Sequence, residues 1–410
     1  MDAVKGAITG RDLDMPWQYV KDWNPIKIDA LGLVTLLGAE EVGRAVGSLE
    51  KRRFTEYLPL LGALVIAGER FLDQQLGYNL YVINDGVQTT QLNGWFTRWA
   101  AAQKTKDATT IFRWRVAGKT SLVSAWDYLA MAISLLVVMP LLPCTALVGD
   151  WWGVANWAAI TLSIWVRVAL LWPIRTSLEP HCAPHETKKG WELEHLPGED
   201  EIKILVVRPD GRMFTILTMR DFLPAFSRRV LSEPPKRYKI AAYVGWLAFG
   251  VHACTLGMCT LMTQIYTMVL LVASTWLYVK RFDADIQGKS HTSADWGGGT
   301  SIGDAECEVI TTRPFGNGIE VQQINTGDRL DRRMHAYARL QLDVEQETLL
   351  KEWHMLPVHS GLTKSWYESY GRAKSDFVRW VEKHEAKVLL LWLRRPRQRR
   401  QRYGDGTATL

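Results

Sequence analysis

The sequence predicts an α-helical integral membrane protein with four transmembrane helices in two hairpins and with α+β cytoplasmic regions. Two uncharged stretches and the positions of the basic residues lead to this prediction. Residues 240–279 contain no Asp, Glu, Lys or Arg, although charged residues make up 22% of the chain. A membrane-crossing helix needs roughly 20 apolar residues, so this run is long enough to cross twice.

The first hairpin is predicted from an earlier apolar block. Residues 128–149 contain no charged side chain, and Asp150 marks a tight turn. Residues 151–172 form the returning span, which only Arg167 interrupts. Pro140 is expected to kink the first span, which a membrane helix tolerates when neighbouring groups satisfy the carbonyl that proline leaves free. The four predicted helices are 128–149, 151–172, 240–258 and 261–279.

Basic residues beside the spans determine the expected orientation. The two hairpin turns contain no Lys or Arg. The basic flanking residues all fall on the opposite side: Arg113, Arg115, Lys119, Arg175, Lys236, Arg237, Lys239, Lys280 and Arg281. Cytoplasmic flanks are enriched in Lys and Arg, so both termini and the loop 173–239 should be cytoplasmic. The first residues do not resemble a signal sequence, so we expect the first hundred to stay in the cytosol.

The composition agrees with concentrated apolar segments and a large water-exposed remainder. The mean hydropathy of −0.08 is too low for a chain made mostly of lipid-facing helices. The 19 Trp residues favour a membrane protein, since Trp prefers the membrane–water interface. Two of the five Cys residues lie in the uncharged stretch 240–279 and one lies in the predicted span 128–149, so we expect no disulfide framework. The apolar run 57–68 is too short to span, and predicts a buried or interfacial helix or else a re-entrant element.

The cytoplasmic regions are predicted to contain two β-hairpins and several helices. One hairpin covers 202–217 around a Pro-Asp-Gly turn, and the other covers 305–324 around a second glycine-containing turn. These hairpins are expected either to share a small antiparallel sheet or to remain separate. Apolar residues at helical spacing predict one helix over 330–344 and a longer one over 366–391.

Together these expectations divide the chain into seven parts. They are a cytoplasmic N-terminal helical region (1–125), transmembrane hairpin 1 (126–173), a cytoplasmic loop with β-hairpin and helix (174–238), transmembrane hairpin 2 (239–280), a glycine-rich linker (281–304), cytoplasmic β-hairpin and helices (305–393) and a basic tail (394–410).

The basic tail is a candidate lipid-binding segment. Its arginines are Arg394, Arg395, Arg397, Arg399, Arg400 and Arg402. Next to a membrane, each basic residue is attracted to anionic cytoplasmic lipid by about 1 kcal/mol. The alternative is a solvated tail without a partner. With a modest net charge of +6, the chain is not expected to bind nucleic acid.

The loop after the second span contains possible metal ligands. They are His181, Cys182, His185 and His195. Imidazole and thiolate are suitable ligands for zinc or another transition metal. Their spacing matches no established zinc pattern, however, so the sequence favours an ordinary polar loop. We therefore expect no cofactor, with a transition metal such as zinc as the alternative.

Three polar residues inside the spans are candidates for a transport pathway. Arg167 is five residues from the cytoplasmic end of its predicted span, so its side chain is expected to reach the interface. His252 and Gln264 lie deeper, on either side of a turn. They are expected to hydrogen-bond between helices, or alternatively to line a polar pathway.

These observations favour a non-enzymatic scaffold or regulatory protein that presents cytoplasmic surfaces to protein partners and to anionic lipid. Most of the chain is predicted to be cytoplasmic, and no nucleophile–base–acid set stands out in the sequence. The first alternative is a subunit of an oligomeric channel or transporter, and the second is a metal-dependent membrane enzyme that uses residues 181–195.

Overall fold

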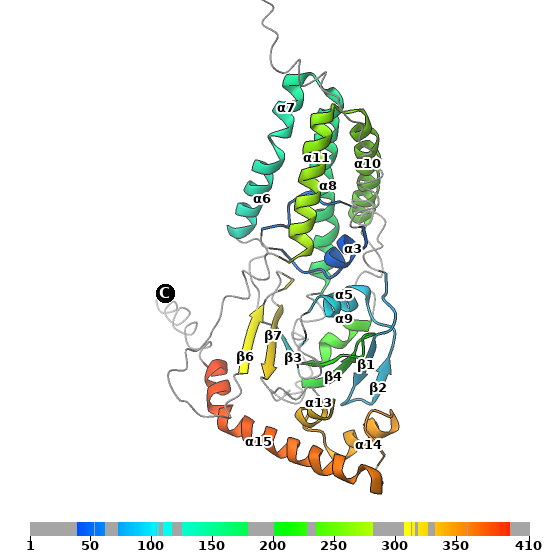
Figure 1. Cartoon of the computed structure of the whole chain (residues 1–410), viewed down its shortest axis with the longest axis vertical. Helices are drawn as coiled ribbons and strands as arrows, with labels where there is room; N and C mark the ends of the chain where they lie inside the picture. The colour runs from blue at the N-terminus through cyan, green and yellow to red at the C-terminus, as the bar shows by residue number, and fades with distance from the viewer. Residues whose placement is uncertain are drawn as a thin grey trace, which may run out of the picture.

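The fold is described from a computed structural model of the chain. It describes residues 39–52, 54–61, 73–103, 105, 110–116, 125–178, 201–227, 235–281, 307–312, 314–315, 319–326, 333–358 and 360–393. Helices that are long and apolar gather at one end of the molecule, and a β-sheet with further helices forms the other end (Figure 1). We call these two parts the helical unit and the sheet unit.

The helical unit contains four segments long and apolar enough to cross a membrane. The first is formed by two helices in sequence, and the other three are single helices. They are α6 (Ala125–Val138) with α7 (Leu141–Val148), α8 (Trp151–Ser177), α10 (Lys236–Met258) and α11 (Leu261–Val279). The prediction of four such helices is therefore confirmed, with bounds that differ by at most five residues.

Short breaks and turns separate these helices. Pro140 stands between α6 and α7, because proline has no N–H to continue the helical bonding. Gly149 ends α7 with φ +72°, a left-handed conformation that glycine adopts without a steric penalty. Asp150 then begins α8 by accepting a hydrogen bond from the Gly153 N–H at 2.9 Å. Both reversals lie at the end of the helical unit farthest from the sheet (Figure 1).

The sheet unit is built on a seven-stranded mixed sheet in the order β2-β1-β4-β5-β3-β7-β6. The strands are β1 (Asn79–Val82), β2 (Val87–Thr89), β3 (Thr110–Val116), β4 (Glu201–Val207), β5 (Met213–Met219), β6 (Cys307–Thr312) and β7 (Ile319–Thr326). All neighbouring pairs are antiparallel except β3 and β5, which are parallel.

The two predicted hairpins are confirmed as β4–β5 and β6–β7. They do share one sheet, but the expectation of a small antiparallel sheet is wrong. Strand β3 lies between the hairpins and pairs in parallel with β5. The predicted N-terminal helical region therefore contributes β1, β2 and β3 as well as helices. The segment Thr110–Val116 alternates buried Phe112 and Trp114 with partly buried Arg113 and Arg115, which gives it the two-residue period of a strand.

Helices cover both faces of the sheet. The helices outside the helical unit are α3 (Ala39–Gly47), α5 (Gly94–Ala102), η2 (Arg220–Phe222), α9 (Leu223–Ser227), α13 (Arg333–Arg339), α14 (Val344–Glu352), η3 (Gly361–Thr363) and α15 (Lys364–Leu393). The predicted helix over 330–344 is interrupted, because Gln341 has φ +46° and Asp343 caps α14. The face toward the helical unit packs on α5 and α9, and the opposite face packs on α13, α14 and α15.

One apolar core continues from the sheet unit into the helical unit. Trp95, Trp99 and Trp114 are fully buried in it, and the Trp114 ring contacts those of both Trp95 and Trp99. The same core includes Leu170 and Ile174 of α8. Several Trp residues are thus core residues of the sheet unit rather than interface residues, because their rings fill the space between the sheet and the helices.

Candidate functional site

The most unusual site in the described residues is a group of buried charged side chains where the two units meet. We call it the buried charge cluster. Its members, with their exposed fractions, are Glu50 (5%), Arg52 (3%), Glu56 (3%), Arg167 (2%) and Arg175 (8%), together with Arg281 and the ring of Tyr278 (1%). Charged groups are rarely buried without partners, so the bonds within the cluster indicate its role.

Glu56 and Arg175 form the central ion pair. Arg175 Nη1 donates to Glu56 Oε1 at 2.7 Å, and the backbone N–H of Arg52 donates to Glu56 Oε2 at 3.1 Å. Burial by itself raises the pKa of Glu56, but the charge and hydrogen bond of Arg175, followed by the charge of Arg167, outweigh burial and lower the pKa below its ordinary value. Glu56 is therefore a stable carboxylate at neutral pH.

The arginines of α8 also bind the backbone of the loop that follows α3. Arg175 Nε donates to the Leu49 carbonyl at 2.9 Å, and Arg175 Nη2 donates to the Glu50 carbonyl at 3.0 Å. Arg167 donates to the carbonyls of Glu56 and Leu58, the latter at 2.7 Å. Two guanidinium groups of one helix thereby fix four carbonyls of a segment that is more than 100 residues away in sequence.

Arg167 is enclosed by protein and is only 2% exposed. Its guanidinium lies 5.7 Å from the centre of the Tyr278 ring, and that of Arg52 lies 5.4 Å from the same ring. A cation over an aromatic face is stabilised most strongly where water is excluded. Arg167 therefore contacts the loop and α11 where the two units meet, and its reach to a membrane interface stays a prediction.

The end of α11 joins the same cluster. Arg281 makes an ion pair with Glu50, and Arg52 Nη2 lies 3.4 Å from the second carboxylate oxygen of Glu50. Arg281 has φ +56° and Leu49 has φ +58°, a conformation that costs a non-glycine residue roughly 1–2 kcal/mol. Both positive angles occur where the chain turns into the cluster, so the ion pairs and carbonyl contacts hold a strained backbone.

Besides α8, the same loop is tied to two more helices of the helical unit, α6 and α11. Lys51 Nζ lies 2.7 Å from Asp127 Oδ2 of α6, and Ser134 of α6 donates to the Tyr57 carbonyl. The Leu61 N–H donates to Thr275 Oγ1 of α11 at 2.9 Å. The predicted element 57–68 is described only as far as residue 61, and those first residues lie among the helices. Residues 62–68 are outside the described part of the chain.

A second group of polar side chains lies within the helical unit, farther from the sheet unit, and is uncharged. The amide nitrogen of Asn156 donates to Thr267 Oγ1 at 3.0 Å, which leaves its oxygen to accept from His252 Nδ1 at 2.6 Å. These bonds join α8, α10 and α11. Gln264 Nε2 donates to the Cys259 carbonyl at 3.0 Å, within its own turn.

The three pathway candidates do not meet at one site. Arg167 is 11 residues from Asn156 on α8, which corresponds to about 16 Å along the helix. His252 contacts Asn156, whereas Gln264 bonds to the turn beside Asp150. Asp150 itself accepts from the Thr260 N–H at 2.8 Å and from Thr263 Oγ1 at 3.0 Å. These polar groups therefore hold neighbouring helices and turns together.

The other predicted site residues lie outside the described residues. This applies to the possible metal ligands His181, Cys182, His185 and His195, and to all six arginines of the basic tail. Among the residues that the structure describes, no group of three or more His, Cys, Asp or Glu side chains is arranged to hold a metal ion.

Sequence reasoning missed the partners that give the buried charge cluster its form. Glu56 is paired with an arginine 119 residues later, a separation that no local pattern reveals. One signal was available, however. Arg167 and Arg175 are eight residues apart on one helix, a spacing that places both toward the same side and indicates a shared partner.

Comparison of the chain with protein-family models, with curated proteins and with solved structures found no match.

Proposed function

We propose that the protein is a multi-pass integral membrane protein with four transmembrane helices in two hairpins. The strand order supports this topology. Strands β1–β3 precede the first candidate span, β4 and β5 lie between the second and third, and β6 and β7 follow the fourth. Because all seven pair in one sheet, the three segments that carry them must lie on one side of any membrane that the helices cross.

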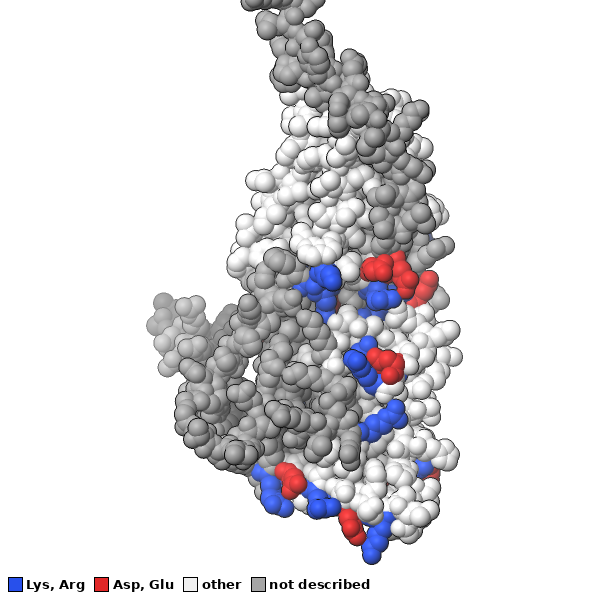
Figure 2. Space-filling view, in the orientation of Figure 1, with Lys and Arg blue, Asp and Glu red and all other residues white. Residues whose placement is uncertain are grey.

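We propose that this side is the cytoplasm, with both termini on it. On the face shown in Figure 2, the charged side chains of the described residues gather over the sheet unit and the level where the units meet. Lys236 and Lys239 begin α10, and Lys280 follows α11 at the same end. Exposed Trp151 and Trp152 mark the opposite end, as expected for rings at a membrane–water interface.

Within this topology we propose a non-enzymatic scaffold or regulatory protein. The observation that carries the proposal is the buried charge cluster, which fixes the sheet unit to the helices through ion pairs, carbonyl contacts and a shared apolar core. The polar side chains between the helices bond to one another, which favours a rigid support over a conducting pathway. The function is then to hold a folded surface at a fixed orientation beside the membrane.

The surface that a protein partner would contact is at the far end of the sheet unit. Leu362 is 96% exposed and Val358 is 70% exposed, and the Thr363 hydroxyl holds the two positions together by donating to the Val358 carbonyl. The neighbouring hollow is lined by Lys364 and Tyr367, among others. Exposed apolar groups with a polar rim are typical of protein interaction sites. Anionic lipid is proposed as a second partner, through Arg394–Arg402.

The proposed function is tested by chemical crosslinking in native membranes followed by purification of the full-length protein. The variant Leu362→Asp is expected to reduce partner recovery about tenfold, because apolar anchors dominate the free energy of such interfaces. Val87→Asp is the matched control, since Val87 is also an exposed aliphatic residue of the sheet unit but lies on the β2 edge.

Two outcomes would contradict the proposal. One is an identical set of crosslinked proteins for wild type and Leu362→Asp. The other is ion or solute flux in liposomes that contain the purified protein, which would favour an oligomeric channel or transporter. Stoichiometric metal in the purified protein would instead favour the metal-dependent enzyme.

A further inference from the structure

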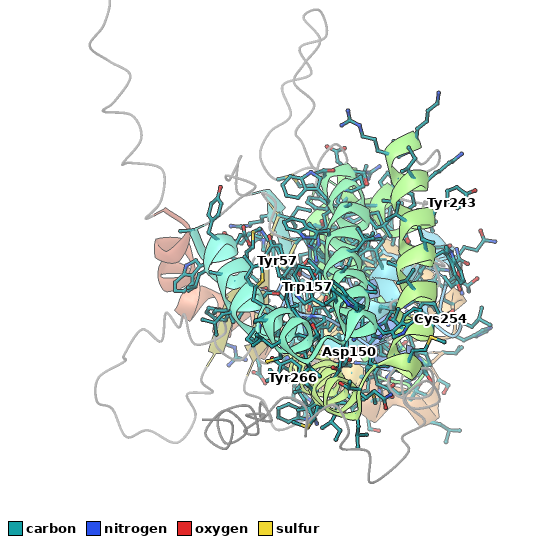
Figure 3. All side chains as sticks on the ribbon, turned by 90° about the horizontal axis from the view of Figure 1, so that it is seen from above. Tyr57, Asp150, Trp157, Tyr243, Cys254 and Tyr266 are labelled. Atoms are coloured by element: carbon teal, nitrogen blue, oxygen red, sulfur yellow. The ribbon has the colours of Figure 1, made fainter. Side chains whose placement is uncertain are left out.

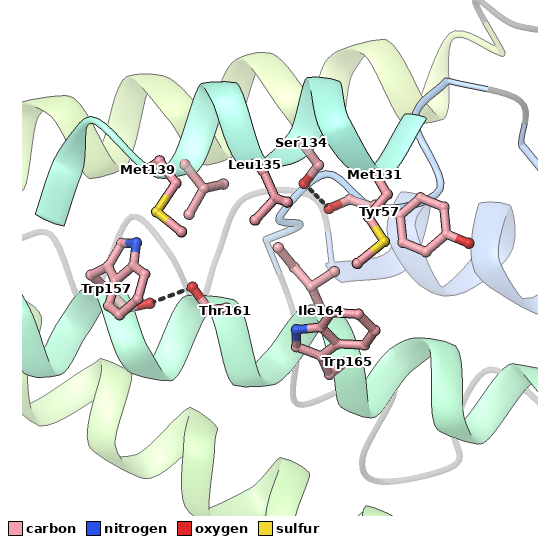
Figure 4. Close-up of a pocket in the computed structure, with 10 residues that line it drawn as sticks. Tyr57, Met131, Ser134, Leu135, Met139, Trp157, Thr161, Ile164 and Trp165 are labelled. Atoms are coloured by element: carbon pink, nitrogen blue, oxygen red, sulfur yellow. Dashed lines mark hydrogen bonds between the residues drawn. The ribbon is translucent and has the colours of Figure 1, made fainter. Parts of the chain in front are cut away.

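A groove runs between α6 and α8 on the side of the helical unit. Its walls include Met131 and Leu135 of α6, Met139 in the break after α6, and Trp157 and Trp165 of α8, and Tyr57 closes the end nearest the sheet unit (Figure 4). The enclosed part has a volume of about 40 Å³. Seen from above, Tyr57 and Trp157 lie between the two helices, whereas Tyr243 and Cys254 lie on the outer side of α10 (Figure 3).

The groove is apolar and open on one side. Leu135, Met139 and Trp165 are 41%, 43% and 48% exposed although they line it. Its two aliphatic hydroxyl groups already have acceptors, since Ser134 donates to the Tyr57 carbonyl and Thr161 donates to the Trp157 carbonyl at 2.9 Å, and the third hydroxyl, the phenol of Tyr57, lies at one end. A molecule in the groove is therefore held by apolar contact, and it must enter from the side that faces the surroundings of the helices.

The length and position of the groove restrict what fills it. Met131 lies on α6, and Met139 follows the last residue of that helix eight positions later, so the apolar wall is about 12 Å long at the helical rise per residue. Half of a hydrocarbon layer is roughly 15 Å thick, which is the depth that one acyl chain occupies. The groove begins at the end of the helical unit nearest the sheet unit, so it lies at the depth of the cytoplasmic leaflet in the proposed topology.

The end of the groove nearest the sheet unit is polar. Tyr57 lies there, and Lys51 and Asp127 form their ion pair in the same region. Burial raises the pKa of Tyr57, and the nearby Asp127 carboxylate raises it further, so the phenol stays protonated and can donate a hydrogen bond. One polar end followed by about 12 Å of apolar wall matches an ester-linked acyl chain.

We propose that this groove binds one acyl chain of a glycerophospholipid from the cytoplasmic leaflet. The inference rests on the proposed membrane topology but not on the scaffold function. In a membrane the surrounding lipid is as apolar as the groove, so selective binding depends on the fit of the chain against the Met and Trp side chains.

The test uses full-length protein in phosphatidylcholine vesicles that contain a phospholipid with a photoreactive diazirine in its acyl chain. After illumination, mass spectrometry locates the labelled residues. Labelling is expected to be several-fold higher at Met131, Met139 and Trp165 than at Tyr243 and Leu247, which are exposed on α10 and do not line the α6–α8 groove. Leu135→Trp fills the groove and should remove this excess. Leu136→Trp is the matched control, because position 136 is 75% exposed and does not line the groove.

Each other outcome overturns the proposal in a recognisable way. Equal labelling of the α6–α8 groove and of α10 would show a non-selective lipid layer. Loss of the label when a sterol is added, but not when unlabelled phospholipid is added, would assign the groove to a sterol. Labelling of the groove that survives Leu135→Trp would show that the chain does not occupy it. Extraction of the protein by alkaline carbonate would instead reject the membrane topology, independently of the groove.

Discussion

The helical unit and the buried charge cluster differ in the charge of the polar side chains that they bury. Among the helices, Asn156, His252 and Thr267 are neutral and bond to one another across three helices. In the buried charge cluster, fully charged groups such as Glu56 and Arg175 are buried just as deeply and are paired. Neutral interhelical bonds contribute about 0.6 kcal/mol on average in a membrane, whereas breaking a buried ion pair costs about 3–5 kcal/mol.

This difference indicates where the molecule is held together. The helices pack against one another mainly through apolar contact, and their few hydrogen bonds select which faces meet. The loop between α3 and residue 61 has little regular structure of its own, so its position depends on the arginines of α8. We therefore expect the coupling between the two units to depend far more on the buried charge cluster than on the polar groups among the helices.

The largest expected effect comes from removing one partner of the central ion pair. Arg175→Leu leaves the Glu56 carboxylate buried and unpaired, so the free energy of unfolding should fall by about 3–5 kcal/mol. Thermal unfolding of the purified protein in detergent measures this change. Arg44→Leu is the control, because its pair with Glu40 is exposed and should contribute no more than about 1 kcal/mol. Equal losses of unfolding free energy in the two variants would show that the buried ion pair contributes no more than the exposed one.

A smaller effect is expected from acid, and its sign follows from the pKa of Glu56. The folded-state pKa is lowered below the ordinary value of 4.5, so the carboxylate contributes stability that is fully present above pH 4.5. This contribution is lost as pH falls below 4.5 and through the folded-state pKa. The loss should be visible as a drop in Tm that Glu56→Gln no longer shows. A Glu56→Gln protein with an unchanged acid dependence would contradict this assignment.

The smallest effect is expected in the helical unit. Asn156→Leu removes the bonds to His252 and Thr267 and should lower the free energy of unfolding by about 0.6 kcal/mol, and by no more than about 1.7 kcal/mol. The same unfolding measurement compares it with Arg175→Leu. A loss of unfolding free energy as large as that of Arg175→Leu would show that the polar groups among the helices contribute as much stability as the buried charge cluster.

The four long apolar helices could be predicted from the sequence, whereas the buried charge cluster could not. A run such as 240–279 needs no partner to be recognised, because length and lack of charge define it. The hairpins β4–β5 and β6–β7 were also predictable, since their turns lie within the local sequence. Strand β3 was missed because its neighbours β5 and β7 come much later in the chain. The buried charge cluster was missed for the same reason, because its arginines and its loop meet only in the folded molecule.

The position of β3 also has a consequence for biosynthesis. Ile111 pairs with Thr215 on one side and with Ile324 on the other, so both neighbours of this strand are translated after it. At 5–20 residues per second the second neighbour emerges roughly 10–40 s after β3. During that interval the strand has an open edge, and the arginines in its sequence TIFRWRV oppose aggregation of a segment that is otherwise rich in β-forming residues. The sheet can be completed only after both helical hairpins have been made, so β7 is its last strand, and α13, α14 and α15 are made later still and cover its other face.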